Sequence, residues 1–252
     1  MTKTQKIAVV TGGASGIGAE ICRYLAKDGI DIAIWDLNEE AMATVAAEVS
    51  ELGRRVSTHL VDISDRQSVE AAAKATREQL GPVTVLANSA GMHATGSLMD
   101  LDDAAWDKVM AVNLRGAFVV TQVLVPDMEA AGWGRIIYIS SSSAQTGSPD
   151  MSHYAASKGG VIGLTKALAV ELGPKGITVN NVPPGMVVTP MLENLVSKGG
   201  IPGGVESMAA RLPVQTAGAP KNIAKAVSYL ASDEANYVTG HTLSVNGGRY
   251  MN

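Results

Sequence analysis

The chain has 252 residues, of which 46% are hydrophobic and 17% are charged, and its formal net charge is −4. These values are typical of a soluble globular protein of one large or two small domains, and they lack the basic character that nucleic acid or an anionic membrane selects. The single cysteine, Cys22, excludes an intrachain disulfide, and no His/Cys cluster has the spacing of a metal site. We find no run of roughly 18 apolar residues and no signal-peptide pattern, so we expect a cytoplasmic protein.

Short, β-branched apolar runs alternate with longer stretches of helical periodicity along the chain. Strands are predicted at residues 7–11, 31–35, 56–61, 83–87, 135–140, 177–180 and 242–245. Helices are predicted at residues 16–27, 39–52, 65–80, 103–130, 152–172 and 220–231. This alternation predicts a single α/β domain over residues 1–252, with a three-layer doubly wound (Rossmann) fold and a seven-stranded, mostly parallel sheet.

Residues 183–219 interrupt the alternation. Proline and glycine are frequent there, while Met186, Met191, Leu192 and Met208 give the segment an apolar face. A long insertion after a strand usually has a function. We therefore expect a substrate-binding lid at about residues 186–217, the alternative being a flexible connector.

The first predicted strand runs into the sequence TGGASGIG at residues 11–18, which opens the first helix. Glycines let a backbone approach a pyrophosphate, and a helix N-terminus offers free N–H groups and a favourable dipole. Asp36 follows the second strand, where a carboxylate can accept hydrogen bonds from a ribose 2′-hydroxyl and would repel a 2′-phosphate. Leu37 and Asn38 supply no compensating base. The pattern therefore predicts NAD rather than NADP.

Tyr154 and Lys158 are four residues apart in a predicted helix, so they share one face. A free tyrosine has a pKa of about 10, and a neighbouring ammonium can lower it toward the range of an acid/base catalyst. By chance alone such a pair is expected in about one chain in four of this composition, so its weight depends on the motifs around it.

Further motifs follow the same order as the predicted elements. They are Asp62-Ile63, NSAG at residues 88–91, Asn113, Ser141, and PGMVVT at residues 184–189. Together with TGGASGIG and the Tyr154/Lys158 pair, they resemble the short-chain dehydrogenase/reductase family in its single-domain branch, nearly end to end. Two departures are Ser89, where the family usually has a second Asn, and Pro183, which stiffens the turn before Pro184.

The resemblance implies a catalytic tetrad of Asn113, Ser141, Tyr154 and Lys158. Tyr154 would be the acid/base, Ser141 would bind the substrate oxygen, and Lys158 would lower the Tyr154 pKa and bind the nicotinamide ribose. Asn113 would hold a water that links Lys158 to solvent. The residues expected to bind the cofactor are Gly12, Ser15, Gly16, Ile17, Gly18, Asp36, Leu37, Asp62, Ile63, Asn88, Ala90, Gly91, Tyr154, Lys158, Pro184, Gly185, Val187 and Thr189.

The substrate is expected to be a small molecule, a secondary alcohol or ketone on a medium-sized hydrophobic or cyclic body. Its expected contacts are Ser141, Ser143, Met151, Tyr154, Met186 and Met191. The alternative is a 3-oxoacyl-thioester reductase or 3-hydroxyacyl dehydrogenase, with Arg211 or Lys198 available for a carrier phosphate.

A more remote alternative is a non-catalytic NAD-binding sensor. We interpret His93 and His153 as polar wall or solvated residues rather than catalysts.

Small residues along 152–172 favour close helix packing, and the family resemblance implies a homotetramer.

Overall fold

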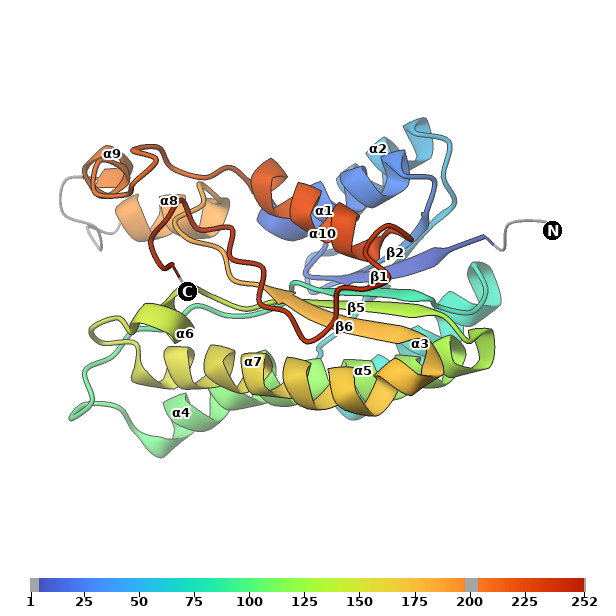
Figure 1. Cartoon of the computed structure of the whole chain (residues 1–252), viewed down its shortest axis with the longest axis horizontal. Helices are drawn as coiled ribbons and strands as arrows, with labels where there is room; N and C mark the ends of the chain where they lie inside the picture. The colour runs from blue at the N-terminus through green and yellow to red at the C-terminus, as the bar shows by residue number, and fades with distance from the viewer. Residues whose placement is uncertain (1–4, 198–203, 252) are drawn as a thin grey trace.

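The computed structural model describes residues 5–197 and 204–251, in which a parallel sheet lies between two layers of helices (Figure 1). Six strands form this sheet in the order β3–β2–β1–β4–β5–β6, and every neighbouring pair is parallel. The bounds are β1 Ile7–Thr11, β2 Asp31–Asp36, β3 Val56–Leu60, β4 Val85–Asn88, β5 Gly134–Ile139 and β6 Ile177–Val182. The predicted doubly wound fold is confirmed, with one strand fewer than expected.

Helices cover both faces of the sheet (Figure 1). One face carries α1 (Gly16–Lys27), α2 (Glu39–Glu51) and α10 (Pro220–Ala231), and the other carries α3 (Arg66–Gln79), α4 (Asp103–Met110), α5 (Gly116–Ala131) and α7 (Ser152–Leu172). The remaining helical segments are α6 (Ser143–Thr146), a 3₁₀ turn (Gly173–Lys175), α8 (Pro190–Ser197) and α9 (Gly204–Ala209). The sequence did not predict α8 and α9, which lie within the proline- and glycine-rich segment.

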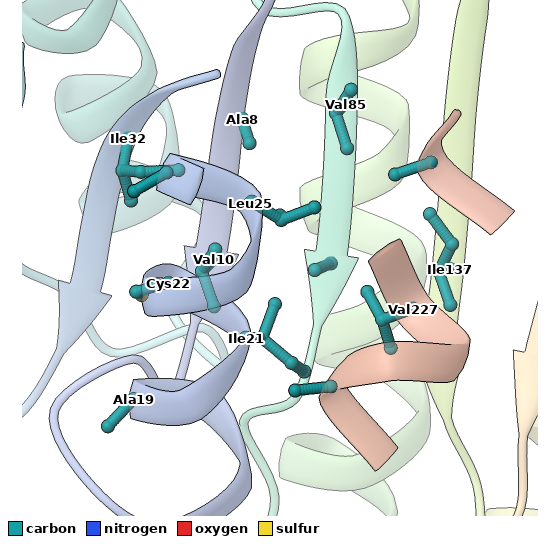
Figure 2. Packing of buried hydrophobic residues seen from close by; sticks show 14 of the residues in the cluster. Ala8, Val10, Ala19, Ile21, Cys22, Leu25, Ile32, Val85, Ile137 and Val227 are labelled. Carbon is teal, nitrogen blue, oxygen red and sulfur yellow. The ribbon is translucent and has the colours of Figure 1, made fainter. Parts of the chain in front are cut away.

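Five of the strands are buried on both faces, as apolar runs without alternation predict, whereas the edge strand β3 is partly exposed. Successive side chains of a strand point to opposite faces. Accordingly Ala8 and Val10 lie in one core, while Ile7 and Val9 lie in the other. Figure 2 shows the first core, where α1 and α10 pack over the central strands.

The prediction of a seventh strand at residues 242–245 is wrong, although the segment runs beside β6. The Asn181 amide donates to His241 O at 3.0 Å, and the Gly185 amide donates to Val245 O at 3.2 Å. Alternate residues donate along a parallel ladder. The donor between these two would be Pro183, which has no N–H. The ladder is therefore reduced to isolated bridges at Asn181–Thr242 and Pro184–Val245.

The predicted helix at 103–130 is one helical run, α4 to α5, with a π turn at Ala111–Arg115. An 18-residue window of this 29-residue run has a mean hydropathy of 1.5, so by length and composition it could cross a membrane. This was not predicted from the sequence, because charged and polar residues interrupt the run. Val119, Leu124 and Met128 are fully buried in the second core. Packing in the second core therefore explains part of this apolar character, because 44% of the window is buried.

The strand order reverses between β1 and β4, which are paired although β2 and β3 separate them in the chain. Thr11 and Asn88 are register partners at the carboxyl ends of these two strands. In doubly wound sheets the ligand crevice lies outside the carboxyl ends at such a reversal. The topology therefore places the glycine loop after β1 beside the loops that follow β4 and β5.

Gly176 is a position where the fold requires glycine. Its φ is +79°, and a Cβ there would stand 2.3 Å from the carbonyl oxygen of Gly132. We predict that Gly176→Ala lowers the free energy of unfolding by roughly 2–4 kcal/mol, from left-handed strain plus the clash. Urea unfolding followed by circular dichroism measures this.

The control is Gly29→Ala, because Gly29 also has a positive φ (+87°) but no atom within 4 Å of the added Cβ. It should cost only about 1–2 kcal/mol. Equal losses in the two variants would contradict the close approach of residues 132 and 176.

Candidate active site

The loop between β1 and α1 is shaped to receive an anion. A Cβ at Gly18 would stand 2.0 Å from Gly12 O, and a Cβ at Gly12 would stand 2.8 Å from Ala90 Cα, so glycine is needed at both positions. Ser15 is the N-cap of α1, but its hydroxyl makes no capping bond. The first amides of the helix lack an intrahelical acceptor. The loop therefore fits a dinucleotide pyrophosphate, with free donors and the positive end of a helix dipole.

Asp36 lies against this loop at the end of β2. One carboxylate oxygen, Oδ2, accepts the Ala14 amide at 3.0 Å, and Oδ1 accepts the amides of Leu37 and Asn38 at 2.7 and 3.1 Å. These bonds fix the carboxylate and leave part of its acceptor capacity free. The Leu37 side chain beside it is 68% exposed. A negative acceptor and an apolar surface thus stand together at the rim of the loop.

The chain after β4 is tied to β1 through Thr11. Its hydroxyl donates to Asn88 Oδ1 at 2.8 Å and accepts the Ala90 amide at 3.1 Å. The Ser89 amide donates to Thr11 O at 3.2 Å. The anchoring therefore uses the Ser89 backbone, which explains how serine replaces the amide side chain usual in the family pattern.

Asp62 and Ile63 follow β3, and the side chain of the first is exposed while that of the second is buried. Asp62 is exposed, and its Oδ1 accepts both the amide and the hydroxyl of Ser64, at 2.8 and 2.7 Å. Ile63 is 5% exposed and lies so close to α5 that a Cβ at Gly116 would meet Ile63 Cδ1 at 2.9 Å. The pair thus anchors the loop on α5 and presents a carboxylate outward.

Three of the predicted catalytic side chains meet where β5 ends. Ser141 lies just beyond β5, while Tyr154 and Lys158 lie one turn apart on α7. Lys158 Nζ donates to the carbonyl oxygen of Ile139 at 2.9 Å, and Tyr154 is hydrogen-bonded to Ser141. The Ser143 amide donates to Ser141 Oγ at 3.1 Å. A phenol, an alcohol and an amine are therefore gathered at the carboxyl edge of the sheet.

Burial determines the direction of the pKa shifts at this edge. Desolvation raises the pKa of the Tyr154 phenol, and the hydrogen bond with Ser141 offsets only part of that rise. Desolvation also lowers the pKa of Lys158 to about 8. The Tyr154/Lys158 spacing predicts an acidic tyrosine. In the chain alone the direction is the opposite, because burial of the phenol dominates.

Asn113, the fourth predicted residue, lies within the π turn and is 1% exposed. Its Oδ1 accepts the Met92 amide at 2.8 Å, while its Nδ2 donates to Met92 O at 3.0 Å and to Ser157 Oγ at 3.1 Å. It thereby joins the chain after β4 to the helix that carries Lys158. A Cβ at Gly91 would lie 3.1 Å from both Asn113 Oδ1 and Lys158 Nζ, so Gly91 keeps the space beside both open.

The segment after β6 brings the last predicted cofactor residues to the glycine loop. Thr189 Cγ2 would lie 3.5 Å from a Cβ at Gly16, and a Cβ at Gly185 would meet Asn246 O at 2.6 Å. Val187 forms a bridge with Gly218, whose amide donates to Met186 O at 2.9 Å. The insertion therefore leaves and rejoins the fold at one point, next to the loop at residues 12–18. Ile17, also predicted to bind cofactor, packs against the first core.

The predicted substrate contacts are placed unevenly. Ser143 and Met186 are buried, and Met151 is half-buried at the start of α7. The Met191 side chain and Lys198 lie outside the described part of the structure. Arg211, proposed for a carrier phosphate, is exposed.

Three features of the site were not predicted from the sequence. They are the Ile139 carbonyl, the Ser157 hydroxyl and the ring contact of His93, whose centroid lies 5.4 Å from that of Tyr154; the sequence predicted His93 only as a polar wall or solvated residue. The position of Ser157 could have been predicted, because it follows Tyr154 by three residues in a predicted helix and therefore lies near the same helix face. The backbone acceptor and the His93 contact depend on tertiary packing.

Comparison with protein families gives a match of residues 6–199 to the model of the short chain dehydrogenases. The chain is 43% identical to nodulation protein G of Azospirillum brasilense over 97% of this chain and 98% of that protein. It is 36% identical to the 3-oxoacyl-[acyl-carrier-protein] reductase of Thermotoga maritima, over 96% and 97% of the two chains.

Two solved structures with the same fold are also dehydrogenases or reductases by name. An actinorhodin polyketide ketoreductase variant with NADPH matches with a TM-score of 0.93 and 36% identity, over 98% of both chains. Carveol dehydrogenase from Mycobacterium avium, in complex with NAD, matches with a TM-score of 0.90 and 33% identity, over 96% of both chains. The two neighbours carry different nicotinamide coenzymes.

Proposed function

Because this chain belongs to the short-chain dehydrogenase/reductase family of oxidoreductases, we propose that it interconverts a secondary alcohol and a ketone with NAD as coenzyme. The observation that carries the proposal is the meeting of Ser141, Tyr154 and Lys158 at the end of β5, beside the glycine loop. A non-catalytic NAD-binding sensor would need the loop and Asp36 but not these side chains. The substrate in this proposal is a medium-sized hydrophobic or cyclic molecule.

Tyr154 exchanges the proton of the reacting oxygen. In the oxidising direction its phenolate takes the proton of the alcohol, and in the reducing direction its hydroxyl gives a proton to the forming alkoxide. Ser141, which is bonded to Tyr154 and oriented by the Ser143 amide, donates to the same oxygen and stabilises its charge. When bound, a nicotinamide coenzyme would supply the hydride chemistry and, in its oxidised form, a positive charge.

Lys158 and Asn113 assist Tyr154 without contacting the substrate oxygen in this proposal. With a pKa of about 8, Lys158 exchanges protons readily near neutral pH, and its hydrogen bond to Ile139 O holds it in place. Asn113 fixes the chain after β4 on α7. The space that Gly91 leaves between Asn113 and Lys158 is where we place a water that carries the proton toward solvent.

The coenzyme preference rests on Asp36. Its carboxylate is held beside the glycine loop by three amides, where it can accept hydrogen bonds from ribose hydroxyls. A 2′-phosphate at the same place would be repelled. We therefore propose NAD, as in the carveol dehydrogenase complex, rather than the NADPH of the polyketide ketoreductase.

The second candidate function is reduction of a 3-oxoacyl thioester or oxidation of a 3-hydroxyacyl thioester. It is favoured by the similarity to the Thermotoga 3-oxoacyl-[acyl-carrier-protein] reductase over nearly the whole of both chains. We further propose that the insertion at about residues 186–217, of which 198–203 lie outside the described part of the structure, forms a lid over the substrate, since its two ends are hydrogen-bonded together beside the glycine loop.

The outer face of α5 and α7 favours assembly. It carries a groove of about 680 Å³, with exposed Phe118, and α7 presents small residues to it. The lining residues are Asp107, Met110, Ala111, Leu114, Arg115, Phe118, Gly160, Gly163, Leu164 and Ala167. We propose a homotetramer in which this face packs against a second copy.

Replacing Tyr154 tests the acid/base role. We predict that Tyr154→Phe lowers turnover of any active alcohol by roughly 10²- to 10⁴-fold, because the proton acceptor is lost. NAD binding, followed by fluorescence titration, should be nearly unchanged. Tyr237→Phe is the control, since Tyr237 is 99% exposed, and it should keep full activity. Retained turnover in Tyr154→Phe would remove Tyr154 from the mechanism.

Replacing Asp36 tests the coenzyme assignment. The ratio of kcat/KM with NAD to that with NADP should exceed one in the wild type and fall by roughly 10-fold or more in Asp36→Ala, because the repulsion of the 2′-phosphate is removed. Glu39→Ala removes a nearby exposed carboxylate at the start of α2 and should leave the ratio unchanged. A wild type that prefers NADP would overturn the assignment.

A further inference from the structure

Arg249 lies in the C-terminal tail, between the two segments that the proposed function assigns to the substrate. On one side its Nη2 donates to Ser148 Oγ at 3.4 Å, in the loop that leads from Ser141 to α7. On the other side a Cβ at Gly248 would stand 2.7 Å from Pro213 Cγ, near the end of the insertion. Figure 1 shows the C-terminus at the end of the molecule where α6 and α8 lie. The tail therefore places Arg249 where the catalytic loop meets the proposed lid.

The guanidinium of Arg249 has no charged partner in the described part of the chain. Arg23 and Arg77 are half-buried, as Arg249 is, and both reach carboxylates, at 2.7 and 2.9 Å. Within residues 5–197 and 204–251, no carboxylate oxygen lies within 4.0 Å of the Arg249 guanidinium, whose side-chain hydrogen bond there is the long one to Ser148. A guanidinium carries several N–H donors and no acceptor. Most donors of Arg249 are therefore available to a bound anion.

Serine hydroxyls connect Arg249 to the proposed catalytic residues. Because a guanidinium can only donate, Ser148 Oγ accepts from it, and the Ser148 hydroxyl donates to Ser143 Oγ at 3.3 Å. The Ser143 amide in turn donates to Ser141 Oγ at 3.1 Å. Ser143 is buried, and its hydroxyl proton has no acceptor among the described residues. A line of donors thus leads from the tail to Ser141, which the proposed function places on the substrate oxygen.

The same region contains a buried acceptor that the described residues leave unused. Gln145 Nε2 donates to Ser244 Oγ of the tail at 3.3 Å, while Gln145 Oε1 is buried without a hydrogen-bond partner in that part of the chain. Buried polar atoms are normally paired with protein, water or ligand. The polar cluster formed between loop and tail is therefore suited to a polar part of a bound molecule. Its members are Ser143, Gln145, Ser148, Ser244 and Arg249, and the arginine is its one ionisable side chain.

We propose that Arg249 determines substrate specificity by binding a carboxylate of the substrate. A planar guanidinium matches the two oxygens of a carboxylate with parallel, charge-assisted hydrogen bonds. The favoured substrates are oxo acids and the corresponding hydroxy acids, rather than neutral ketones and alcohols of the same size. This inference rests on the proposed function and narrows its substrate.

A series of matched probes tests the inference. The acids 4-oxopentanoate, 5-oxohexanoate and 6-oxoheptanoate are ionised at neutral pH, and their methyl esters carry the same ketone without the charge. With NADH as reductant, we expect the wild type to reduce at least one acid with a kcat/KM about 10-fold or more above that of its ester. The length with the largest ratio measures the spacing between the carboxylate and the reacting carbon.

Three variants make the outcome specific. Arg249→Met removes the charge and keeps an unbranched side chain. It should lower kcat/KM for the preferred acid by about 10- to 100-fold, mainly through a higher KM, and leave the ester within about 3-fold. Arg249→Lys keeps the charge without the planar fork and should retain part of the preference. The control is Arg54→Met, because Arg54 is also half-buried but donates to Gly29 O at the opposite edge of the sheet. It should leave the ratio unchanged.

Each result decides the question. Equal losses on acid and ester in Arg249→Met, with kcat lowered, would show that Arg249 only positions Ser143 and Ser141. An unchanged ratio in that variant would show that it does not bind the substrate. A wild type that reduces every ester at least as well as its acid also overturns the inference and leaves the proposed function standing. Absence of turnover on all probes and on a panel of secondary alcohols counts against the proposed function itself.

Discussion

The hydrogen bond from Lys158 Nζ to the carbonyl oxygen of Ile139 joins the helix that carries Tyr154 to the strand that leads into Ser141. Both partners of this bond are buried, and Tyr154, one turn away on the same helix, is half-buried. Desolvation disfavours the charged form of each group. The site therefore holds two groups that exchange protons only when a neighbouring charge or hydrogen bond compensates for the lost water.

The surrounding structure supplies part of that compensation and fixes the position of the groups. Ser141 bonds the phenol, and Asn113 clamps the chain after β4 onto α7 from a π turn, a local widening that is frequent at functional sites. The sheet brings these elements together because its order reverses between β1 and β4. The same reversal puts the glycine loop and Asp36 on the other side of the crevice.

Much of this arrangement follows from local sequence rules. The apolar runs predict six strands within a few residues, and the helices at 16–27, 152–172 and 220–231 begin and end as predicted. The motif residues lie close together because the strands are parallel, so that their carboxyl ends and the loops that follow them lie at the same edge of the sheet. The predicted seventh strand is wrong because Pro183 removes one donor from its ladder, an effect visible only once the pairing partner is known.

What the sequence could not predict depends on burial and packing. The spacing of Tyr154 and Lys158 indicates a charge beside a phenol, but the direction of the pKa shift depends on how much water the fold excludes. The contact of His93 with Tyr154 likewise requires the loop after β4 to lie against the first turns of α7. Helices α8 and α9 were not predicted because the segment around them is rich in glycine and proline, which are typical of loops.

The central claim is that Tyr154 is a neutral phenol in the chain alone and becomes the proton acceptor when oxidised coenzyme is bound. The direct measurement is the ultraviolet absorbance of tyrosinate during a pH titration, taken as the difference between wild type and Tyr154→Phe. We predict a Tyr154 pKa above the ordinary value of about 10 without NAD, and a clear fall when saturating NAD is present. An unchanged titration on NAD binding would contradict the account.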